Sequence, residues 1–569
     1  MVVVTDFIVA LSVVFIVAGA LLVVANHLGF PPVPFYILAG LLSGTVIADE
    51  NLLELALWGI AFLVFVFGIR VDFEQIRSVL RDGEVAAFTQ LAIVAPIAFI
   101  VGFLLGEFFG FENTFRNALY FSAAATLSST LVGGRILREE IRNNLVHGRL
   151  AASIHFFDDM VAIGAILVLS ADVLTDHQLV TSKIGYGVLF IILALIIYRH
   201  GYPLLTRVAD GSNELILMGS VSILIGFIAL AEIVEISIVV GAFAAGLAVR
   251  GDGAAHLGVR NGIESIKDFF AAIFFVTVGA LVAIPTMQTL VLALSLFGLV
   301  VFVNPLIHTI AFVLEGYDGR TGFLAGSSLN QVSELALVVA IQAWLLESIA
   351  PALFDAIILA AAVTMILSAV AGRFEQRGYE MFLAPILEGR TGYIDENSAV
   401  TETLQDHVII VGYGRQGRRI ARTLETLERP YLVIENDPAI QSDLSRECEN
   451  FVFGDAMAAY PLEKARVADA RLIISTVDHE PVSRVLLNEA TDADLILRAD
   501  SSQEAEALLD AGARFVIVPS VLASDQLIEN LERVLGDETT LGEIESNHRS
   551  FLFNIEEFER ERRATRRHY

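Results

Sequence analysis

Two adjacent aspartates, Asp158 and Asp159, lie about half way along an apolar stretch between residues 147 and 171. An ionisable side chain in a stretch long enough to cross a membrane is costly to bury, so its presence predicts a functional role. Two neighbouring carboxylates at low dielectric constant cannot both ionise cheaply, and we expect one to keep a proton until a cation replaces it. The alternative is that both acids pair with an arginine of a neighbouring helix and only hold the helices together.

A histidine lies one turn before this pair. On a helix, His155 would share a face with Asp159, because residues four apart are neighbours. An imidazole there could pair with the carboxylate or tune it. The alternative is a histidine with only a packing or hydrogen-bonding role.

Polar residues interrupt two further apolar stretches. Thr126 and Ser129 lie in the first interruption, at 125–130, and Gln331 and Glu334 in the second, at 326–334. Broken helices at matching places in two halves are typical of ion sites built from inverted repeats, because unwound backbone can coordinate an ion. The alternative is close helix packing, which also uses small and hydroxyl residues.

A glycine pattern follows a short apolar stretch near residue 411. It comprises Gly412, Gly414 and Gly417, with Arg415 and Gln416 between the last two. Glycines between a strand and a helix allow backbone amides and the helix N-terminus to meet a phosphate. Glu435 ends the next expected strand, about twenty residues on, which suits it to ribose hydroxyls. The alternative is a Rossmann-like domain whose pocket no longer binds.

Long apolar runs must position the aspartates. Each run can cross the roughly 30 Å core of a bilayer, where only helices satisfy the backbone of such a segment. We expect thirteen spans, at residues 5–27, 33–49, 52–69, 84–107, 116–134, 147–171, 179–198, 213–232, 235–250, 266–285, 288–314, 322–345 and 352–372.

Charge fixes the expected orientation. Thirteen Lys and Arg residues near the ends of the spans fall on one side, against Arg116 and Lys183 on the other. Since cytoplasmic loops keep basic residues, we expect the N-terminus outside and the C-terminus in the cytoplasm.

The net charge of −28 argues against nucleic-acid binding. The single cysteine, Cys448, excludes an internal disulfide and a cysteine-based metal site.

These patterns predict four segments. Residues 1–374 form the helical membrane domain, and 375–405 a polar linker. Short strands alternate with helices over 406–522, which predicts a parallel α/β sheet of Rossmann type. Residues 523–569 have a helical pattern and are expected to form a dimer or docking helix.

The chain resembles the monovalent cation:proton antiporters of the Kef type, within the cation:proton antiporter-2 family. The similar segments are 124–131, 157–160, 235–248, 266–281 and 331–340. The resemblance implies that Asp159 is the cation and proton ligand, and that Asp158 stands where Kef-type members usually carry Gln. Asn304 occupies the place of a usual Lys or Arg, so either retained protons neutralise the carboxylates or His308 partly substitutes.

The C-terminal half resembles the TrkA-N domain, the regulator-of-potassium-conductance domain found below potassium channels and transporters. This implies that Asp455 lies beside an adenosine and Arg498 near its phosphates. The nucleotide could be NAD(H), AMP or ATP.

Together these features predict a homodimeric antiporter in the cell membrane that exchanges K+ or Na+ for protons, with Asp158 and Asp159 as cation ligands and a nucleotide as regulator. A ligand-gated cation channel is the first alternative, but no repeated filter sequence supports it. A membrane oxidoreductase is the second, and no Cys or paired-His arrangement would hold its second redox centre. We therefore expect no enzymatic activity.

Overall fold

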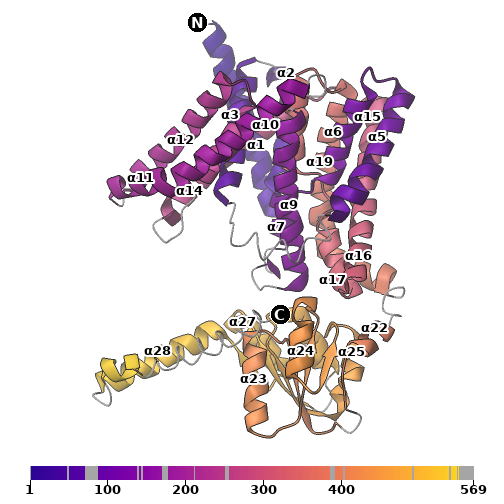
Figure 1. The fold of residues 1–569 in the computed structure, drawn as a ribbon, viewed down its shortest axis with the longest axis vertical. Coiled ribbons are helices and arrows are strands. Elements are labelled where there is room, and N and C mark those ends of the chain that lie inside the picture. Colours follow the sequence, from indigo (N-terminus) through magenta and orange to yellow (C-terminus); the bar gives the residue numbers. More distant parts are fainter. Residues whose placement is uncertain are drawn as a thin grey trace. The chain divides into compact units, whose positions relative to one another are not determined.

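The structure is a computed structural model. It describes residues 2–47, 50–70, 88–137, 140–141, 145–169, 177–210, 212–249, 256–384, 391–401, 404–489, 493–536, 540–546 and 549. The chain divides into two compact units, Met1–Gly389 and Arg390–Tyr569 (Figure 1).

The described part of the first unit consists of helices joined by short non-helical segments. Its elements are α1 (Val2–Leu28), α2 (Pro32–Ile47), α3 (Glu50–Arg70), η1 (Gln90–Val94), α5 (Ala95–Phe109), α6 (Thr114–Thr126), α7 (Thr130–Ile136), α9 (Val146–Leu169), α10 (His177–Ile196), η2 (Ile197–Gly201), α11 (Tyr202–Ala209), α12 (Asn213–Ile233), α13 (Ile238–Ala248), α14 (His256–Ala280), α15 (Met287–Gly298), η3 (Leu299–Val303), α16 (Asn304–Glu315), α17 (Gly319–Ser327), α18 (Glu334–Leu345), α19 (Pro351–Ala371), η4 (Gly372–Phe374), α20 (Glu375–Gly378) and η5 (Tyr379–Leu383). Each expected span contains helix, and the helical fold is as predicted.

Among the described residues, length and composition alone mark five helical stretches as able to cross a membrane: Gln90–Phe109, Gly185–Ala209, Asn213–Ile233, Met287–Glu315 and Pro351–Met381. Some boundaries differ from the sequence prediction. The helix expected to end at residue 198 continues through η2 and α11 to Ala209, and α14 begins at His256, ten residues before the expected span. The reason is that hydropathy marks the apolar length of a helix, whereas polar residues continue its hydrogen bonding beyond that length.

The polar residues of α9 and of the two interrupted stretches are buried in the interior of the first unit. Within it α9 packs against α7, α17 and α18, while α14 packs against α2 and α3. By contrast, α5 and α15 expose apolar side chains such as Leu104, Phe108 and Leu294. An apolar outer face around a buried polar centre is the arrangement that a lipid environment favours.

The second unit is a six-stranded parallel sheet covered by helices (Figure 1). Its strands are β1 (His407–Val411), β2 (Tyr431–Glu435), β3 (Phe451–Phe453), β4 (Ala470–Ser475), β5 (Asp494–Arg498) and β6 (Phe515–Ile517), in the order β3-β2-β1-β4-β5-β6. The helices are α23 (Arg415–Thr426), η6 (Pro438–Ile440), α24 (Gln441–Glu447), α25 (Ala459–Lys464), η7 (Val467–Asp469), α26 (Glu480–Glu489) and α27 (Ser502–Asp510). The order reverses between β1 and β4, and ligands of such sheets bind at the carboxyl ends of the strands beside this point.

Two segments flank the sheet. Before it, α22 (Thr391–Glu396) leads to Ala399, which pairs antiparallel with Phe451 of β3. After it comes α28 (Pro519–Leu535), which has no buried residue. Within the helical tail predicted at 523–569, residues 537–539, 547–548 and 550–569 lie outside the described residues.

Candidate functional site

The two interrupted stretches are broken helices, as the sequence predicts, and their breaks meet. Residues 127–129 separate α6 from α7, and residues 328–333 separate α17 from α18. Ser128 and Val332 form an antiparallel bridge, and the Ser333 amide donates to the Leu127 carbonyl at 3.0 Å. Each break ends in a serine that caps the following helix, Ser129 on α7 and Ser333 on α18. Helix ends with unpaired backbone groups therefore converge beside α9.

Asp158 points into the first break. Its carboxylate is 1% exposed, and its Oδ1 accepts a hydrogen bond from Gln90 Nε2 at 3.0 Å. Its Oδ2 accepts from the Ser128 amide at 3.0 Å and also from the Ser128 hydroxyl. These donors are all neutral, and within the described residues Asp158 has no cationic partner. The arginine pairing considered as an alternative is thus not seen for this residue.

Asp159 makes a different contact. Its Oδ1 accepts from the Thr130 hydroxyl at 2.8 Å, at the first residue of α7, and the residue is 6% exposed. The two adjacent carboxylates therefore have different partners. Asp158 bonds to Ser128 in the break, and Asp159 bonds to Thr130 in α7, the helix that follows the break. Thr130 is an oxygen ligand that could accompany Asp159 around a monovalent cation, because such ions prefer carboxylate, hydroxyl and carbonyl oxygens.

His155 lies against the break and not against Asp159, which differs from the expected pairing. Its Nδ1 is 3.1 Å from the Ser128 hydroxyl, which also bonds to Asp158. The ring packs on Gly133, where an added Cβ would lie 2.2 Å from His155 Nε2. Helical spacing suggested Asp159 as the neighbour of the imidazole, but Ser128 of the break between α6 and α7 lies beside it.

The second break supplies Gln331 and Glu334. The Ser129 hydroxyl donates to the Glu334 carboxylate, so the two breaks are joined by a side-chain hydrogen bond. Gln331 Nε2 donates to the carbonyls of Ser129 at 3.2 Å and Ser328 at 2.7 Å, while its Oε1 accepts from Ser368 at 2.9 Å. Gln331 thus fixes the crossing of the two breaks.

The remaining membrane candidates contact backbone. The Thr126 hydroxyl donates to the Ser122 carbonyl at 2.6 Å, so it is turned back along its own helix. Asn304 Nδ2 donates to the Ala125 carbonyl at 2.7 Å. His308 Nδ1 lies 2.8 Å from the Asn304 carbonyl and makes no hydrogen bond to Asp158 within the described residues, so it does not replace the missing cation there.

Gln90 was not among the predicted residues. It is 1% exposed in η1, and its Nε2 donates both to Asp158 and to the carbonyl of Thr126. The available signal was a single side-chain amide near the start of an otherwise apolar span, next to Thr89. Ser128 and Thr130, the partners of the two aspartates, lie inside the predicted interruption at 125–130 but were not among the predicted residues.

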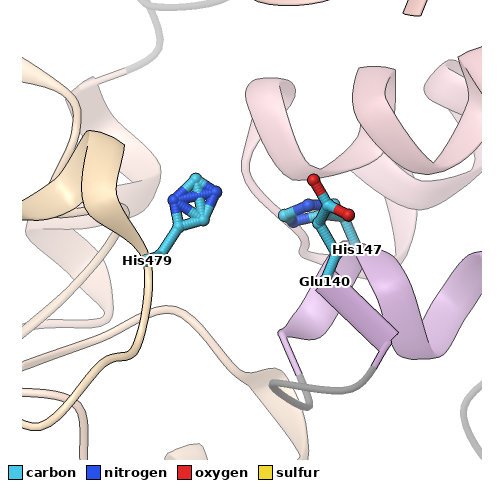
Figure 2. Close-up of side chains that lie close together, drawn as sticks. All are labelled: Glu140, His147 and His479. Carbon is cyan, nitrogen blue, oxygen red and sulfur yellow. The ribbon is translucent and has the colours of Figure 1, made fainter. Parts of the chain in front are cut away.

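One further group of possible metal ligands includes Glu140 and His147. Figure 2 shows these two side chains close together, and a ligand atom of each lies within 4.8 Å of the other. The third labelled residue, His479, belongs to the second unit. Among the described residues of the first unit this group therefore offers two ligands, fewer than the three or four that protein zinc sites use.

In the second unit the three glycines have distinct roles. Gly412 has φ of 91°, a left-handed value that favours glycine. A Cβ on Gly417 would lie 2.0 Å from the Gly412 carbonyl oxygen, so glycine is needed where α23 meets β1. A Cβ on Gly414 would meet nothing within 4 Å. Open space beside Gly414 at the start of α23 fits a phosphate approaching the backbone.

The other predicted nucleotide residues lie at the same edge of the sheet. Glu435 ends β2 and accepts hydrogen bonds from the amides of Tyr413 at 2.6 Å, Asn436 at 2.8 Å and Asp437 at 2.9 Å. Burial nevertheless raises the pKa of the Glu435 carboxyl above its usual range. Asp455 follows β3 and is buried. The edge therefore presents acidic groups on the β2 and β3 side, where ribose hydroxyls would be held.

Arg498 lies at the end of β5, on the other side of the glycine turn. Its Nη1 lies 3.2 Å from Gln416 Oε1 in the first turn of α23, and its Nη2 pairs with Asp478 at 3.4 Å. Arg415 is adjacent to Gln416 in that turn. A guanidinium beside the N-terminus of α23 suits a phosphate, because both offer N–H donors and positive charge. Asp478, its partner, was not predicted.

Comparison with known proteins identifies both units. Residues 12–372 match the family of transmembrane sodium/hydrogen exchangers, and residues 408–519 match the TrkA-N domain. The chain is 24% identical to the putative cation/proton antiporter YbaL of Escherichia coli K12, covering 93% of this chain and 97% of that protein. It is 28% identical to the glutathione-regulated potassium-efflux system protein KefC of Enterobacter sp., covering 84% and 76%.

Two solved structures are also similar. The sodium proton antiporter MjNhaP1 of Methanocaldococcus jannaschii is 16% identical, with 68% of this chain and 100% of that chain covered and a TM-score of 0.48. The TrkA-N domain of inner membrane protein YbaL from Escherichia coli is 23% identical, with 23% and 99% covered and a TM-score of 0.22. The family and domain matches confirm the resemblance found in the sequence.

Proposed function

The chain belongs to the family of transmembrane sodium/hydrogen exchangers, as a cation/proton antiporter with a TrkA-N regulatory unit, and we propose that the cation it exchanges for protons is K+ or Na+. The observation that carries this proposal is the aspartate pair on α9 beside two crossing helix breaks. Asp158 and Asp159 are both at least nine-tenths buried, and the described partners of Asp158 are neutral.

In the proposed mechanism, Asp159 binds a proton and a cation in competition. Ionised Asp159 and the Thr130 hydroxyl, which are 2.8 Å apart, offer adjacent oxygens to a cation. A proton on Asp159 removes the negative charge on which cation binding depends, so the two ligands exclude each other. Ser129, Gln331 and Glu334 hold the breaks together and complete the site. Transport then requires that the site open to one side of the membrane at a time, with α9 and the breaks moving against the other helices.

The TrkA-N unit is proposed to bind NAD(H), AMP or ATP. Gly412, Gly414 and Gly417, with Arg415, Gln416 and Arg498, would receive phosphate, while Glu435 and Asp455 would hold the ribose and adenosine. The bound nucleotide would take no chemical part in the exchange of ions. It changes the populations of conformations only by its different affinity for each.

Residues 391–401 offer a route for that regulation. The Ser398 hydroxyl accepts from the Phe453 amide at 3.0 Å, two residues before Asp455. Asp395 accepts from the Tyr460 hydroxyl at 2.7 Å and pairs with Lys464. The segment that enters the second unit is thus bonded to both sides of the Asp455 loop. A ligand that moves this loop would also move the segment.

We further propose a homodimer in the cell membrane, with the N-terminus outside. The exposed helix α28 supports the dimer, because Leu527, Ile528, Leu531 and Leu535 are 60%, 52%, 47% and 81% exposed. Spaced in this way, they form one apolar face of the helix. A second copy of the same helix would cover that face, as in a coiled coil.

Proton release from liposomes tests the proposed function. The purified chain is reconstituted with a trapped pH-sensitive dye, and K+, Na+ or choline is added with and without each nucleotide. K+ or Na+ should drive proton movement and choline should not. Cation flux without coupled proton movement would contradict the proposal.

A further inference from the structure

Gln90 joins three elements with one side-chain amide. It stands in η1, immediately before α5, and its Nε2 donates to the Thr126 carbonyl at the end of α6 and to Asp158 Oδ1 on α9. The last carbonyls of a helix have no partner within the helix. Gln90 therefore satisfies the end of α6 and one oxygen of a buried carboxylate together.

The other end of this amide is unused. Gln90 Oε1 is buried and has no hydrogen-bond partner in the described part of the chain. A buried carbonyl oxygen without a donor is costly, and most such oxygens in proteins are paired. This oxygen belongs to the same planar group as the nitrogen that touches Asp158, so a half turn of the amide would bring it to the carboxylate.

We propose that Gln90 is a positioning residue that serves both protonation states of Asp158, an inference that rests on the proposed antiport. With Asp158 ionised, Gln90 Nε2 donates to Oδ1, as observed. When a proton binds Oδ1, that oxygen becomes a donor, and the turned amide accepts from it through Oε1. The contact between Gln90 and Asp158 then keeps one donor and one acceptor in both protonation states.

The same turn releases the end of α6. Nε2 leaves the Thr126 carbonyl when Oε1 approaches Asp158, because one amide cannot hold both orientations. Proton binding on Asp158 is in this way linked to the hydrogen bonding of the first break. Ser128, which contacts the other carboxylate oxygen through its amide and hydroxyl, lies in that break.

The titratable groups around Gln90 and Asp158 come from α9 and from the elements packed against α9 and η1. Within the described residues, only His155 reaches Asp158 through hydrogen bonds, by way of the Ser128 hydroxyl. The others on α9 and on the elements packed against α9 and η1 are His147, Arg149, Asp159, Arg116, Tyr120, Tyr186, His308, Glu315, Arg320, Glu334 and Glu107, and the side chains of Arg135, His177 and Lys183 are outside the described set.

Four variants of the full chain in liposomes test the inference. Gln90→Leu removes both orientations, so turnover at saturating cation should fall about tenfold or more, roughly the effect of losing one partner of a buried charged group. The KM for the cation should change less, since Asp159 and Thr130 are intact. Gln90→Glu places a second carboxyl against Asp158, and half-maximal exchange should move to higher pH by about one unit. Gln342→Leu on α18 is the control, because Gln342 makes no side-chain hydrogen bond within the described residues and should behave as wild type.

The double variant Gln90→Glu with Asp158→Asn restores one amide facing one carboxyl and should return the pH profile toward wild type. This comparison does not depend on Gln90→Leu folding, because the double variant keeps the groups of the natural pair. A Gln90→Leu protein that folds and has wild-type turnover would overturn the inference. So would a double variant no closer to wild type than Gln90→Glu alone. Wild-type chain that shows no coupled exchange would instead contradict the proposed antiport.

Discussion

The Ser129 hydroxyl donates a hydrogen bond to the Glu334 carboxylate, although the two residues are 205 positions apart. Each stands at the start of a helix that follows a break, Ser129 before α7 and Glu334 as the first residue of α18. A carboxylate at a helix N-terminus is favoured by the helix dipole. This bond therefore holds two helix starts against each other beside the aspartate pair.

Ser129→Ala is expected to weaken cation binding. It removes a donor to buried Glu334 and the cap on the Val132 amide, worth about 1.5–3 kcal/mol for the charged bond and about 1 kcal/mol for the cap. The KM for the transported cation should rise about tenfold in the liposome assay. Ser222→Ala is the matched control, because that exposed hydroxyl bonds only to Met218 of its own helix. An unchanged KM would contradict a role for the crossing in binding.

Gly133→Ala is expected to destabilise the first unit. Its Cβ would lie 2.2 Å from His155 Nε2, and overpacking of this kind costs about 1–3 kcal/mol. Melting of the detergent-solubilised protein measures the effect, and adding His155→Ala should recover part of it. Gly164→Ala on α9 meets nothing within 4 Å and should be neutral or slightly stabilising. Equal melting of the two single variants would show that His155 does not occupy this position.

The glycines of the second unit should separate folding from binding. Gly417→Ala should lower its stability, because the added Cβ would lie 2.0 Å from a backbone oxygen. Gly414→Ala should leave melting unchanged and weaken nucleotide binding about tenfold or more, since it fills the space beside the phosphate position. Calorimetry with NAD, AMP and ATP on the full chain measures binding. Wild-type affinity in folded Gly414→Ala would place the ligand elsewhere.

The raised pKa of Glu435 predicts a pH dependence of stability. A carboxyl whose pKa is higher in the folded than in the unfolded state stabilises the fold when protonated. That contribution is complete below the ordinary glutamate pKa of about 4.3 and is lost as pH rises through the folded value. Without nucleotide, wild type should therefore lose stability relative to Glu435→Gln as pH rises from about 4. Parallel melting curves of the two proteins against pH would contradict this.

Cross-linking tests the proposed dimer. In a Cys448→Ala background, Leu531→Cys should form an interchain disulfide on mild oxidation, because Leu531 lies on the exposed apolar face of α28. Glu529→Cys, on the opposite side of the same helix, is the control. If both cross-linked at the same rate, α28 would not be the specific contact between copies.

Much of the fold could be predicted from sequence because one physical constraint dominates it. Apolar length and the need to satisfy backbone in lipid predict the helices, and the polar interruptions predict both breaks. The strand, glycine turn and acid at Glu435 likewise predict the order of strand, turn and helix at the carboxyl edge of the sheet. Helix ends were less accurate, as with α14, because hydropathy does not report where hydrogen bonding stops.

The partners within the site could not be predicted in the same way. Helical spacing places His155 and Asp159 on one face, but it does not show that Ser128 of the first break lies beside the imidazole. Nor does a lone amide in an apolar span show that it faces an aspartate. Gln90 lies in η1, 68 residues before Asp158 of α9, and only the tertiary fold brings the two side chains together.

The most direct test of the account is the Asp159→Asn variant in liposomes, with K+ and Na+ gradients and simultaneous recording of proton and cation movement. Asparagine keeps the size of the side chain but cannot exchange a proton for a cation. If Asp159 binds both the proton and the cation, we expect a folded protein with no coupled exchange above the level of empty liposomes. Coupled flux in Asp159→Asn at the wild-type rate would contradict it.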